Sequence, residues 1–471
     1  MKKLLLLSAV AVIFAACEGL DDINVNPNAT EKPQPAYLLT GVEKQGADLY
    51  WGGNANIGTS LLFVQHWAKI QYPEGDRYEF SNSSGEVTTI WNTGYATLVT
   101  DLNTILAFPD AEANPNYKGI ALTLRSWVFQ LLTETYGDIP YKEAGQSLVP
   151  VYNTQKEVYT GILADLTEAL LKLDPAAGSV KGDVVYGGDI AKWRKFAASL
   201  QLRIALRIAD RESALSKSTI DGLNLTELIG SNAETFKFTF SNSPQHNPQA
   251  AAFDTRDDYR ISKTVVDKLT ALSDPRLPIF AQMPKDTDIY VGAGNGLSNS
   301  DAQNQGLSRT SLPGRYFLTP TAPAVIYSYA EVLFNLAEAV ERGYIIGNAV
   351  NYYNAAITAS LEQYEIASAD IATYLAQPAV QYSSAAGGWK QAIGEQKWIA
   401  LFGQGPEAFT EWRRLDYPVL VAGPASVLDG KIPLRLFYPG TEQSLNRTNR
   451  EQAVASQGAD ELTTRLWFDA H

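Results

Sequence analysis

Helical periodicity that recurs in pairs constrains the fold of this chain more than any other feature. In residues 323–342, apolar side chains recur at three- and four-residue spacing, and residues 350–364 repeat the pattern after a turn that contains Gly343 and Gly347. This spacing is that of one face of an amphipathic helix. A hairpin of two such helices cannot bury its apolar faces without a neighbour, so the pattern predicts a stack of helical hairpins.

The same periodicity returns along much of the chain. We expect further helices over residues 35–50, 116–136, 154–173, 189–208, 387–403 and 406–416. Gly137 and Pro140 are placed to end the second of these helices, and Asp189 is placed to cap the fourth. Residues 116–235 and 321–417 are therefore predicted to form a mostly α, tetratricopeptide-like helical repeat half.

The helical pattern is interrupted first in residues 51–91. This segment places aromatic side chains among Gly, Asn and Ser. We expect a helix over residues 59–71 and a loop over residues 72–78, in which Pro and Gly mark turns.

A second interruption lies in residues 236–320. A short strand is expected at 237–240, and a long loop rich in Gly, Asn and Ser is expected over 286–314. A loop of that length inside a compact domain is usually functional. Residues 35–115 and 236–320 are therefore predicted to form a loop-rich binding half.

The candidate ligand-binding residues are aromatic and polar side chains of these two segments. An aromatic ring can pack on the apolar C–H face of a sugar, while polar groups hydrogen-bond its hydroxyls. The predicted site consists of Trp67, Tyr72, Asp76, Arg77, Tyr78, Trp91, Tyr290, Asn295 and Asn299. The alternative is that the aromatics form the core of an irregular subdomain. Near-helical spacing favours that alternative for the two tryptophans, whereas neighbouring Gly or Pro favours exposure of the three tyrosines.

The N-terminal segment predicts where the protein is located. A basic start precedes an apolar run over residues 4–13 and small residues just before Cys17. The stretch of about 13 apolar or small residues is shorter than the roughly 20 that a membrane-spanning helix needs. We therefore predict a lipoprotein signal peptide over residues 1–16, a lipid anchor at Cys17 and a tether over residues 17–34. The alternative is an ordinary secretory signal followed by an unmodified cysteine.

Acidic residues follow this cysteine closely, at Glu18, Asp21 and Asp22. Such a tail resembles the signal by which some Gram-negative bacteria send lipoproteins to the outer face of the outer membrane. The sequence therefore favours a cell outer membrane location that faces the exterior.

Charge and composition exclude several function classes. The formal net charge of −13 repels the phosphate backbone of nucleic acid. One cysteine and three scattered histidines leave no Cys-based zinc site and no cysteine nucleophile, and we assign no metal and no cofactor. A glycoside hydrolase needs two carboxylates about 5 to 9.5 Å apart, and 51 acidic residues leave that alternative open. A structural adaptor for other proteins is a third alternative, against which the export signal argues.

Seven stretches in a fixed order resemble the SusD/RagB family of nutrient-binding outer-membrane lipoproteins. They are Cys17 with its acidic followers, NVNP at 24–27, YGDIP at 136–140, DPRLP at 274–278, YAEVLFNLAEA at 329–339, RRLDYP at 413–418 and IPLRLFYPGTE at 432–442. The resemblance covers essentially the full mature chain. Only Cys17 carries over with a defined role, since ligand contacts vary within the family. We interpret Asp138, Glu331, Arg413 and Arg414 as caps, inter-helix hydrogen-bond partners and buried ion pairs.

The resemblance implies a mostly helical protein in which about four tetratricopeptide-like helix pairs support a loop-rich binding region. It implies a single SusD-like domain over residues 17–471, with a closing segment over residues 418–471. It further implies a surface lipoprotein that is not an enzyme, that captures an oligosaccharide or glycan and that passes it to a SusC-like TonB-dependent outer-membrane transporter. The alternatives are a peptide-binding member of the same family and a surface glycoside hydrolase.

Overall fold

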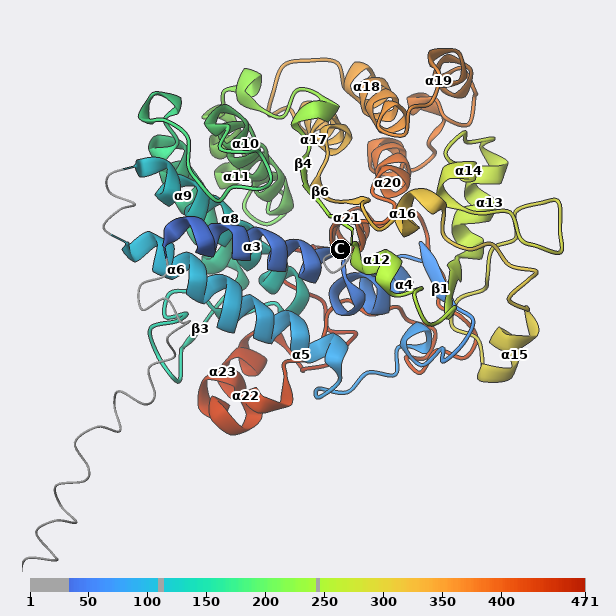
Figure 1. The fold of residues 1–471 in the computed structure, drawn as a ribbon, viewed down its shortest axis with the longest axis horizontal. Helices are drawn as coiled ribbons and strands as arrows, with labels where there is room; N and C mark the ends of the chain where they lie inside the picture. The colour runs from blue at the N-terminus through green and yellow to red at the C-terminus, as the bar shows by residue number, and fades with distance from the viewer. Residues whose placement is uncertain (1–33, 109–113, 243–245, 471) are drawn as a thin grey trace, which may run out of the picture.

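The computed structural model describes residues 34–108, 114–242 and 246–470 (Figure 1). The predicted signal peptide and lipid anchor at Cys17 lie outside the described residues. Helices dominate the described chain, and no described helix combines the length and the apolar composition needed to cross a membrane.

Four pairs of helices form the helical repeats, as predicted. The pairs are α8 (Pro115–Tyr136) with α9 (Gln155–Lys172), α10 (Ile190–Arg207) with α11 (Ser213–Asp221), α17 (Tyr329–Glu341) with α18 (Ala349–Glu362), and α20 (Gly388–Ala400) with α21 (Gly405–Leu415). Side-chain hydrogen bonds cap the N-termini of two of these helices. At α9, the Thr154 hydroxyl accepts from the Glu157 N–H and the Glu157 carboxylate accepts from the Thr154 N–H, which is a capping box. Asp189 caps α10 by accepting from the Lys192 N–H, as expected.

Further elements complete the fold, and long loops connect α13, α14 and α15 on the right of Figure 1. These elements are α3 (Pro35–Trp51), the π-helix η1 (Gly53–Ser60), α4 (Leu61–Phe63), the 3₁₀ turn η2 (Gly75–Arg77), α5 (Gly85–Asn92), the π-helix η3 (Thr93–Val99), α6 (Thr100–Ala107), α12 (Pro248–Ala251), α13 (Lys263–Ala271), α14 (Leu277–Phe280), α15 (Asn299–Asn304) and α16 (Arg315–Leu318). The chain also contains α19 (Ser368–Leu375), and it closes with α22 (Gly440–Leu445) and α23 (Arg447–Gln457).

The strands of the described chain form three small antiparallel sheets. They pair β1 (Trp67–Lys69) with β5 (Tyr259–Ile261), β2 (Ile139–Pro140) with β3 (Tyr152–Asn153), and β4 (Phe236–Thr239) with β6 (Pro323–Tyr327). Strand β4 confirms the strand predicted at 237–240.

Two helix predictions are wrong where tertiary pairing overrides local periodicity. The helix expected over 59–71 ends at Phe63, because Gln65 takes a φ of +54° and the following residues pair as β1 with β5. The helix expected from residue 323 begins at Tyr329 instead. Residues 323–327 pair with β4, and the Ser328 hydroxyl caps the helix by accepting from the Glu331 N–H.

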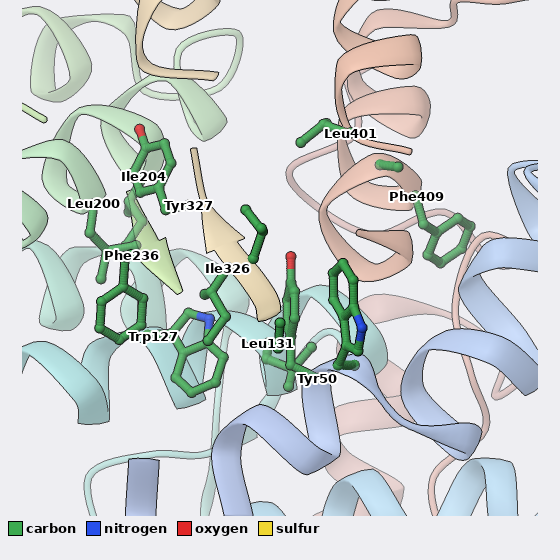
Figure 2. Close-up of a cluster of buried hydrophobic side chains, with 14 of the residues drawn as sticks. Tyr50, Trp127, Leu131, Leu200, Ile204, Phe236, Ile326, Tyr327, Leu401 and Phe409 are labelled. Carbon is green, nitrogen blue, oxygen red and sulfur yellow. The ribbon is translucent and has the colours of Figure 1, made fainter. Parts of the chain in front are cut away.

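An apolar core lies where α3 and α8 meet α10, α21 and the β4–β6 sheet (Figure 2). Its labelled members are Tyr50, Trp127, Leu131, Leu200, Ile204, Phe236, Ile326, Tyr327, Leu401 and Phe409. The rings of Phe196 and Phe236 stack with centroids 3.8 Å apart and thereby fix β4 against α10.

Buried ion pairs join the helix pairs to one another. Arg207 of α10 bonds to Glu134 at 2.7 Å, to Glu407 at 2.6 Å and to Glu411, with its own side chain inaccessible to solvent. Arg203 binds Glu331 at 2.6 Å. The network ties α8, α10, α17 and α21 together, and a buried charge lost from it would be costly to leave unpaired.

Three of the four residues interpreted as structural form the predicted kinds of contact, and Arg413 differs. Asp138 caps α9 by accepting from the Gln155 N–H at 2.8 Å, and Arg414 pairs with Glu338 and Glu411. Arg413 was expected in an ion pair, but its guanidinium donates to the backbone carbonyls of Glu134 and Leu434 at 2.8 and 2.7 Å.

Candidate functional site

The two segments predicted to bind ligand lie side by side. Strand β1 pairs with β5, and Ser262, directly after β5, forms a bridge with Ala293 in the second long loop. The loop after β1 is thereby held next to residues 290–304. Sequence separation of more than 200 residues concealed this contact, although the segments themselves were predicted.

Buried hydrogen bonds of Asp76 and Asn295 join the two loops. The Asp76 carboxylate accepts from the Asn295 amide at 2.8 Å and from the Lys69 N–H at 3.1 Å. The Asn295 amide also donates to the Trp67 carbonyl at 2.8 Å, and its oxygen accepts from the Ser262 hydroxyl at 2.5 Å. Both side chains are buried. Their polar groups therefore form hydrogen bonds between the loops and do not face a ligand.

Burial changes the pKa of the Asp76 carboxyl group. Removal from water raises the pKa of Asp76 to about 6, although the Asn295 amide and the N–H groups of Lys69 and Gly296 partly oppose the change. The carboxylate therefore titrates at mildly acidic pH, within the structure that joins the loops.

Arg77 and Asn299 close the outer edge of the same junction. The Arg77 guanidinium donates to the Asn299 carboxamide oxygen and pairs with Glu79 at 2.7 Å. Asn299 lies on α15 and is exposed, whereas the Arg77 side chain is mostly covered. Of the predicted polar residues, these two remain near enough to solvent to meet a ligand.

Three of the predicted aromatics are core residues. Trp67 packs edge-on against Phe253, with ring centroids 6.0 Å apart, and Trp91 packs against Tyr136 at 5.1 Å. Trp67 is 0%, Tyr78 1% and Trp91 6% exposed. For the two tryptophans, the core alternative is the correct one.

The expected exposure of Tyr78 is wrong. Its backbone takes a left-handed φ of +68°, which turns the side chain inward against Phe63, with ring centroids 5.7 Å apart. Flanking loop residues gave no sign of this turn.

Tyr72 is exposed, as expected, with 59% of its surface accessible. The Arg256 guanidinium lies 4.4 Å from the centre of its ring and is itself paired with Asp258 at 2.8 Å. The cation orients the ring. Tyr72 thus presents a positioned aromatic surface at the rim of the loops.

Tyr290 lines a hollow of about 490 Å³ between α14 and α16. The lining residues are Pro278, Ile279, Ala281, Gln282, Met283, Tyr290, Arg315 and Tyr316. A bridge between Ala281 and Pro313 brings the two ends of the long loop together and so forms the walls. The volume falls within the range of about 300–1,000 Å³ for small-molecule sites.

Tyr316, Arg315 and Gln282 of this lining were not among the predicted site residues. A signal was present: Arg315 and Tyr316 follow Pro313-Gly314 directly at the end of the predicted loop. Only the pairing of the loop ends shows that they face Tyr290.

A larger hollow of about 640 Å³ lies between α9, α10 and α11. Its lining combines seven leucine or alanine residues, among them Leu163, Leu170 and Leu215, with eight polar residues, and it contains no aromatic ring. Because it offers no aromatic ring to pack on the C–H face of a sugar, it suits such a ligand less well than the hollow at Tyr290 does, despite the larger volume. The described residues form no group of three or more His, Cys, Asp or Glu side chains suited to a metal ion.

Comparison with known proteins gives one family and a set of similar structures. A family model for SusD-like proteins, described as starch-binding and associating with the outer membrane, matches residues 27–439. A chitin-binding protein of known structure is 29% identical, with a TM-score of 0.83 over 93% of this chain and 100% of its own. A SusD homologue from Bacteroides fragilis is 26% identical, with a TM-score of 0.79 over 92% and 99%.

A chitin-binding SusD homologue from Flavobacterium johnsoniae is 24% identical, with a TM-score of 0.81 over 92% of this chain and 97% of its own. At that identity, the likeness speaks for the fold alone. No curated protein sequence matches the chain.

Proposed function

Because the chain belongs to the SusD-like family of starch-binding proteins that associate with the outer membrane, we propose that it captures an oligosaccharide at the cell surface and passes it to a SusC-like TonB-dependent transporter. Members of this family are binding proteins rather than enzymes. The proposal therefore concerns which surface holds the glycan and how the protein is anchored.

The observation that carries the proposal is the hollow at Tyr290. It combines two half-buried phenol rings, Tyr290 and Tyr316, with the guanidinium of Arg315. An aromatic face packs on the C–H face of a sugar ring for about 0.5–1.5 kcal/mol beyond the area buried, if values for aromatic pairs apply. The guanidinium and the phenol hydroxyls then pair the hydroxyls of the sugar, each of which would cost about 1–3 kcal/mol if buried unpaired.

Tyr72, Arg77 and Asn299 extend the proposed surface beyond this hollow. Tyr72 offers an exposed ring, and the Arg77–Asn299 pair offers polar groups at the junction of the same two loops. An oligosaccharide of several rings could contact both regions. Because the similar structure with 29% identity is described as chitin-binding and the family as starch-binding, chitin oligosaccharides and starch oligosaccharides are the first ligands to test.

The proposed anchor is a lipid on Cys17. The 17 residue-to-residue steps from Cys17 to Gln34 allow a separation of up to about 55–60 Å, so the body would be free to sit over a transporter in the same membrane. Replacing Cys17 by alanine should release the protein from the membrane fraction. Retention of the Cys17→Ala variant in that fraction would contradict lipid anchoring.

Affinity electrophoresis of the protein over residues 18–471 tests capture. Gels that contain starch or glycol chitin should retard the wild type, and the Tyr290→Ala variant should bind about 5- to 30-fold more weakly, equivalent to about 1–2 kcal/mol. Tyr37→Ala is the matched control, since Tyr37 is 72% exposed on the first turn of α3, away from the hollow. Equal retardation of wild type and Tyr290→Ala would remove the hollow from the site.

A further inference from the structure

We propose that a polar groove between α3 and α5 is a second carbohydrate subsite, which holds one sugar ring of a glycan bound to the loop surface. The inference rests on the proposed function. The groove is separate from the hollow at Tyr290: no residue lines both, and none of its residues belongs to the predicted ligand set.

The size and lining of the groove define the kind of ligand. Its volume is about 290 Å³, just below the range of about 300–1,000 Å³ for small-molecule sites, which suits a single sugar ring. It is lined by Gln45, Asp48, Leu49, Gly53, Asn54, Thr89 and Thr93. Two carboxamides, one carboxylate and two hydroxyls surround a single buried leucine. This set suits a small, uncharged, hydroxyl-rich ring rather than an apolar or anionic ligand.

Several of these polar groups have unused hydrogen-bonding capacity. Asn54 donates from its amide to the Thr89 hydroxyl at 2.7 Å, which fixes its side chain and leaves its oxygen free to accept. Within the described chain, the Gln45 carboxamide and the Thr93 hydroxyl form no hydrogen bond. Asp48 is held by Lys44, which itself lies 5.6 Å from the centre of the Phe240 ring. The side chains of Asn54 and Asp48 are therefore held in place, whereas those of Gln45 and Thr93 are available to hydrogen-bond a ligand.

Two π-helices begin at the groove. Gly53 is the first residue of η1, which is eight residues long, and Thr93 is the first residue of η3, which is seven residues long. π-helices account for well under roughly 1% of residues in proteins and are frequent at functional sites. Their convergence on one groove is an independent reason to assign it a function.

The π-helix η1 also connects the groove to the loop surface. Its first two residues line the groove, and the carbonyl of Gly58 lies at van der Waals distance, 3.4 Å, from the position of a Cβ on Gly75 in η2. The η2 turn carries Asp76 and Arg77, which hold the two ligand loops together. The η1 helix thus runs from the groove to the turn that carries Asp76 and Arg77.

Oligosaccharides of increasing length test the second subsite. Maltose to maltoheptaose, and chitobiose to chitohexaose, are titrated calorimetrically into the wild type and into Asn54→Ala/Thr93→Val. The longest ligand that binds should lose about tenfold in affinity, because two hydrogen-bonding groups are removed, whereas disaccharides should bind unchanged at the loop surface.

Gly53→Phe provides a second variant that keeps every polar group. A Cβ on Gly53 meets no atom within 4 Å, so the added ring can enter the groove without displacing the backbone. It should reproduce the length-dependent loss. The matched control is Asn92→Ala/Thr97→Val, on α5 and η3 but outside the lining, and it should bind like wild type.

The outcomes separate this inference from the proposed function. Wild-type binding that neither groove variant weakens at any length would overturn the second subsite and leave glycan capture intact. A wild type that binds no member of either series would overturn both. If Asn54→Ala/Thr93→Val unfolds at a lower temperature than wild type, the result with Gly53→Phe decides.

Discussion

Replacing Arg207 by methionine should destabilise the protein by about 3–5 kcal/mol. The side chain is inaccessible to solvent and bonds to Glu134, Glu407 and Glu411. Methionine has a helix propensity close to that of arginine and fills a similar apolar volume, so the loss reports on charge rather than on helix formation. Typical domains have a total stability of about 5–15 kcal/mol, which makes this loss a large fraction.

The structure limits the loss to the cost of about one unpaired buried charge. Glu411 keeps Lys397 at 2.7 Å and Arg414 at 2.8 Å, and Glu407 keeps Arg203 at 3.6 Å. Glu134 loses its closest cation and keeps the Gln130 amide at 3.1 Å. The penalty therefore falls mainly on Glu134.

This loss should also depend on pH. Burial already raises the pKa of Glu134, while Arg207 opposes the rise, so the pKa should increase further in the variant. A carboxyl whose pKa is raised by folding loses stability as pH rises through that pKa. The deficit of Arg207→Met should accordingly be larger at pH 7 than at pH 5, because the orphaned carboxyl becomes protonated as the pH falls.

Urea denaturation followed by tryptophan fluorescence measures both effects. Lys142→Met is the matched control, because the Lys142–Glu157 pair is exposed, at 61% and 43%, and should be worth less than about 1 kcal/mol. A loss in Arg207→Met no larger than in Lys142→Met, or a loss that grows towards pH 5, would refute the account of the network.

Three further predictions concern a helix cap, a turn and the Asp76 carboxyl group that joins the two loops. Thr154→Ala removes the capping box of α9 and should cost about 0.5–2 kcal/mol in urea denaturation. Gly182→Ala places a Cβ 1.9 Å from the Ala36 carbonyl oxygen at a φ of +86°, and should lower the melting temperature more than Gly178→Ala, which has a similar φ of +87° but open space. Folding raises the pKa of Asp76 to about 6, so the wild type should lose about 3 kcal/mol of stability as the pH rises from about 4 to about 6. Asp76→Asn should remove this loss. Identical pH profiles of melting temperature for the wild type and Asp76→Asn would contradict the prediction.

Periodicity was sufficient to predict seven of the eight paired helices, because each of these buries one apolar face against its partner, but α11 was not among the expected helices. It failed for residues 323–327, where a short apolar run fits a strand and a buried helix equally well. The run became β6 because β4 lies beside it. Pairing of this kind depends on residues more than 80 positions away and leaves no local signal.

The binding segments could be predicted from composition, but their individual side chains could not. Tyr72 and Tyr78 both belong to the loop that contains Pro73 and Gly75 and both have positive φ, yet one is 59% and the other 1% exposed. Asp76 and Asn295 looked like ligand groups because carboxylate and amide groups recognise sugars, and the same chemistry allows them to bond to each other. Which of the two uses prevails depends on the contact between the loops.

Calorimetric titration of chitin and starch oligosaccharides into the wild-type protein over residues 18–471, with a reducing-sugar assay on the same samples, tests the central claim most directly. Glycan capture predicts saturable binding with no new reducing ends. Release of reducing ends would contradict the claim by identifying a glycoside hydrolase, and absence of heat and of retention with every glycan would contradict carbohydrate capture.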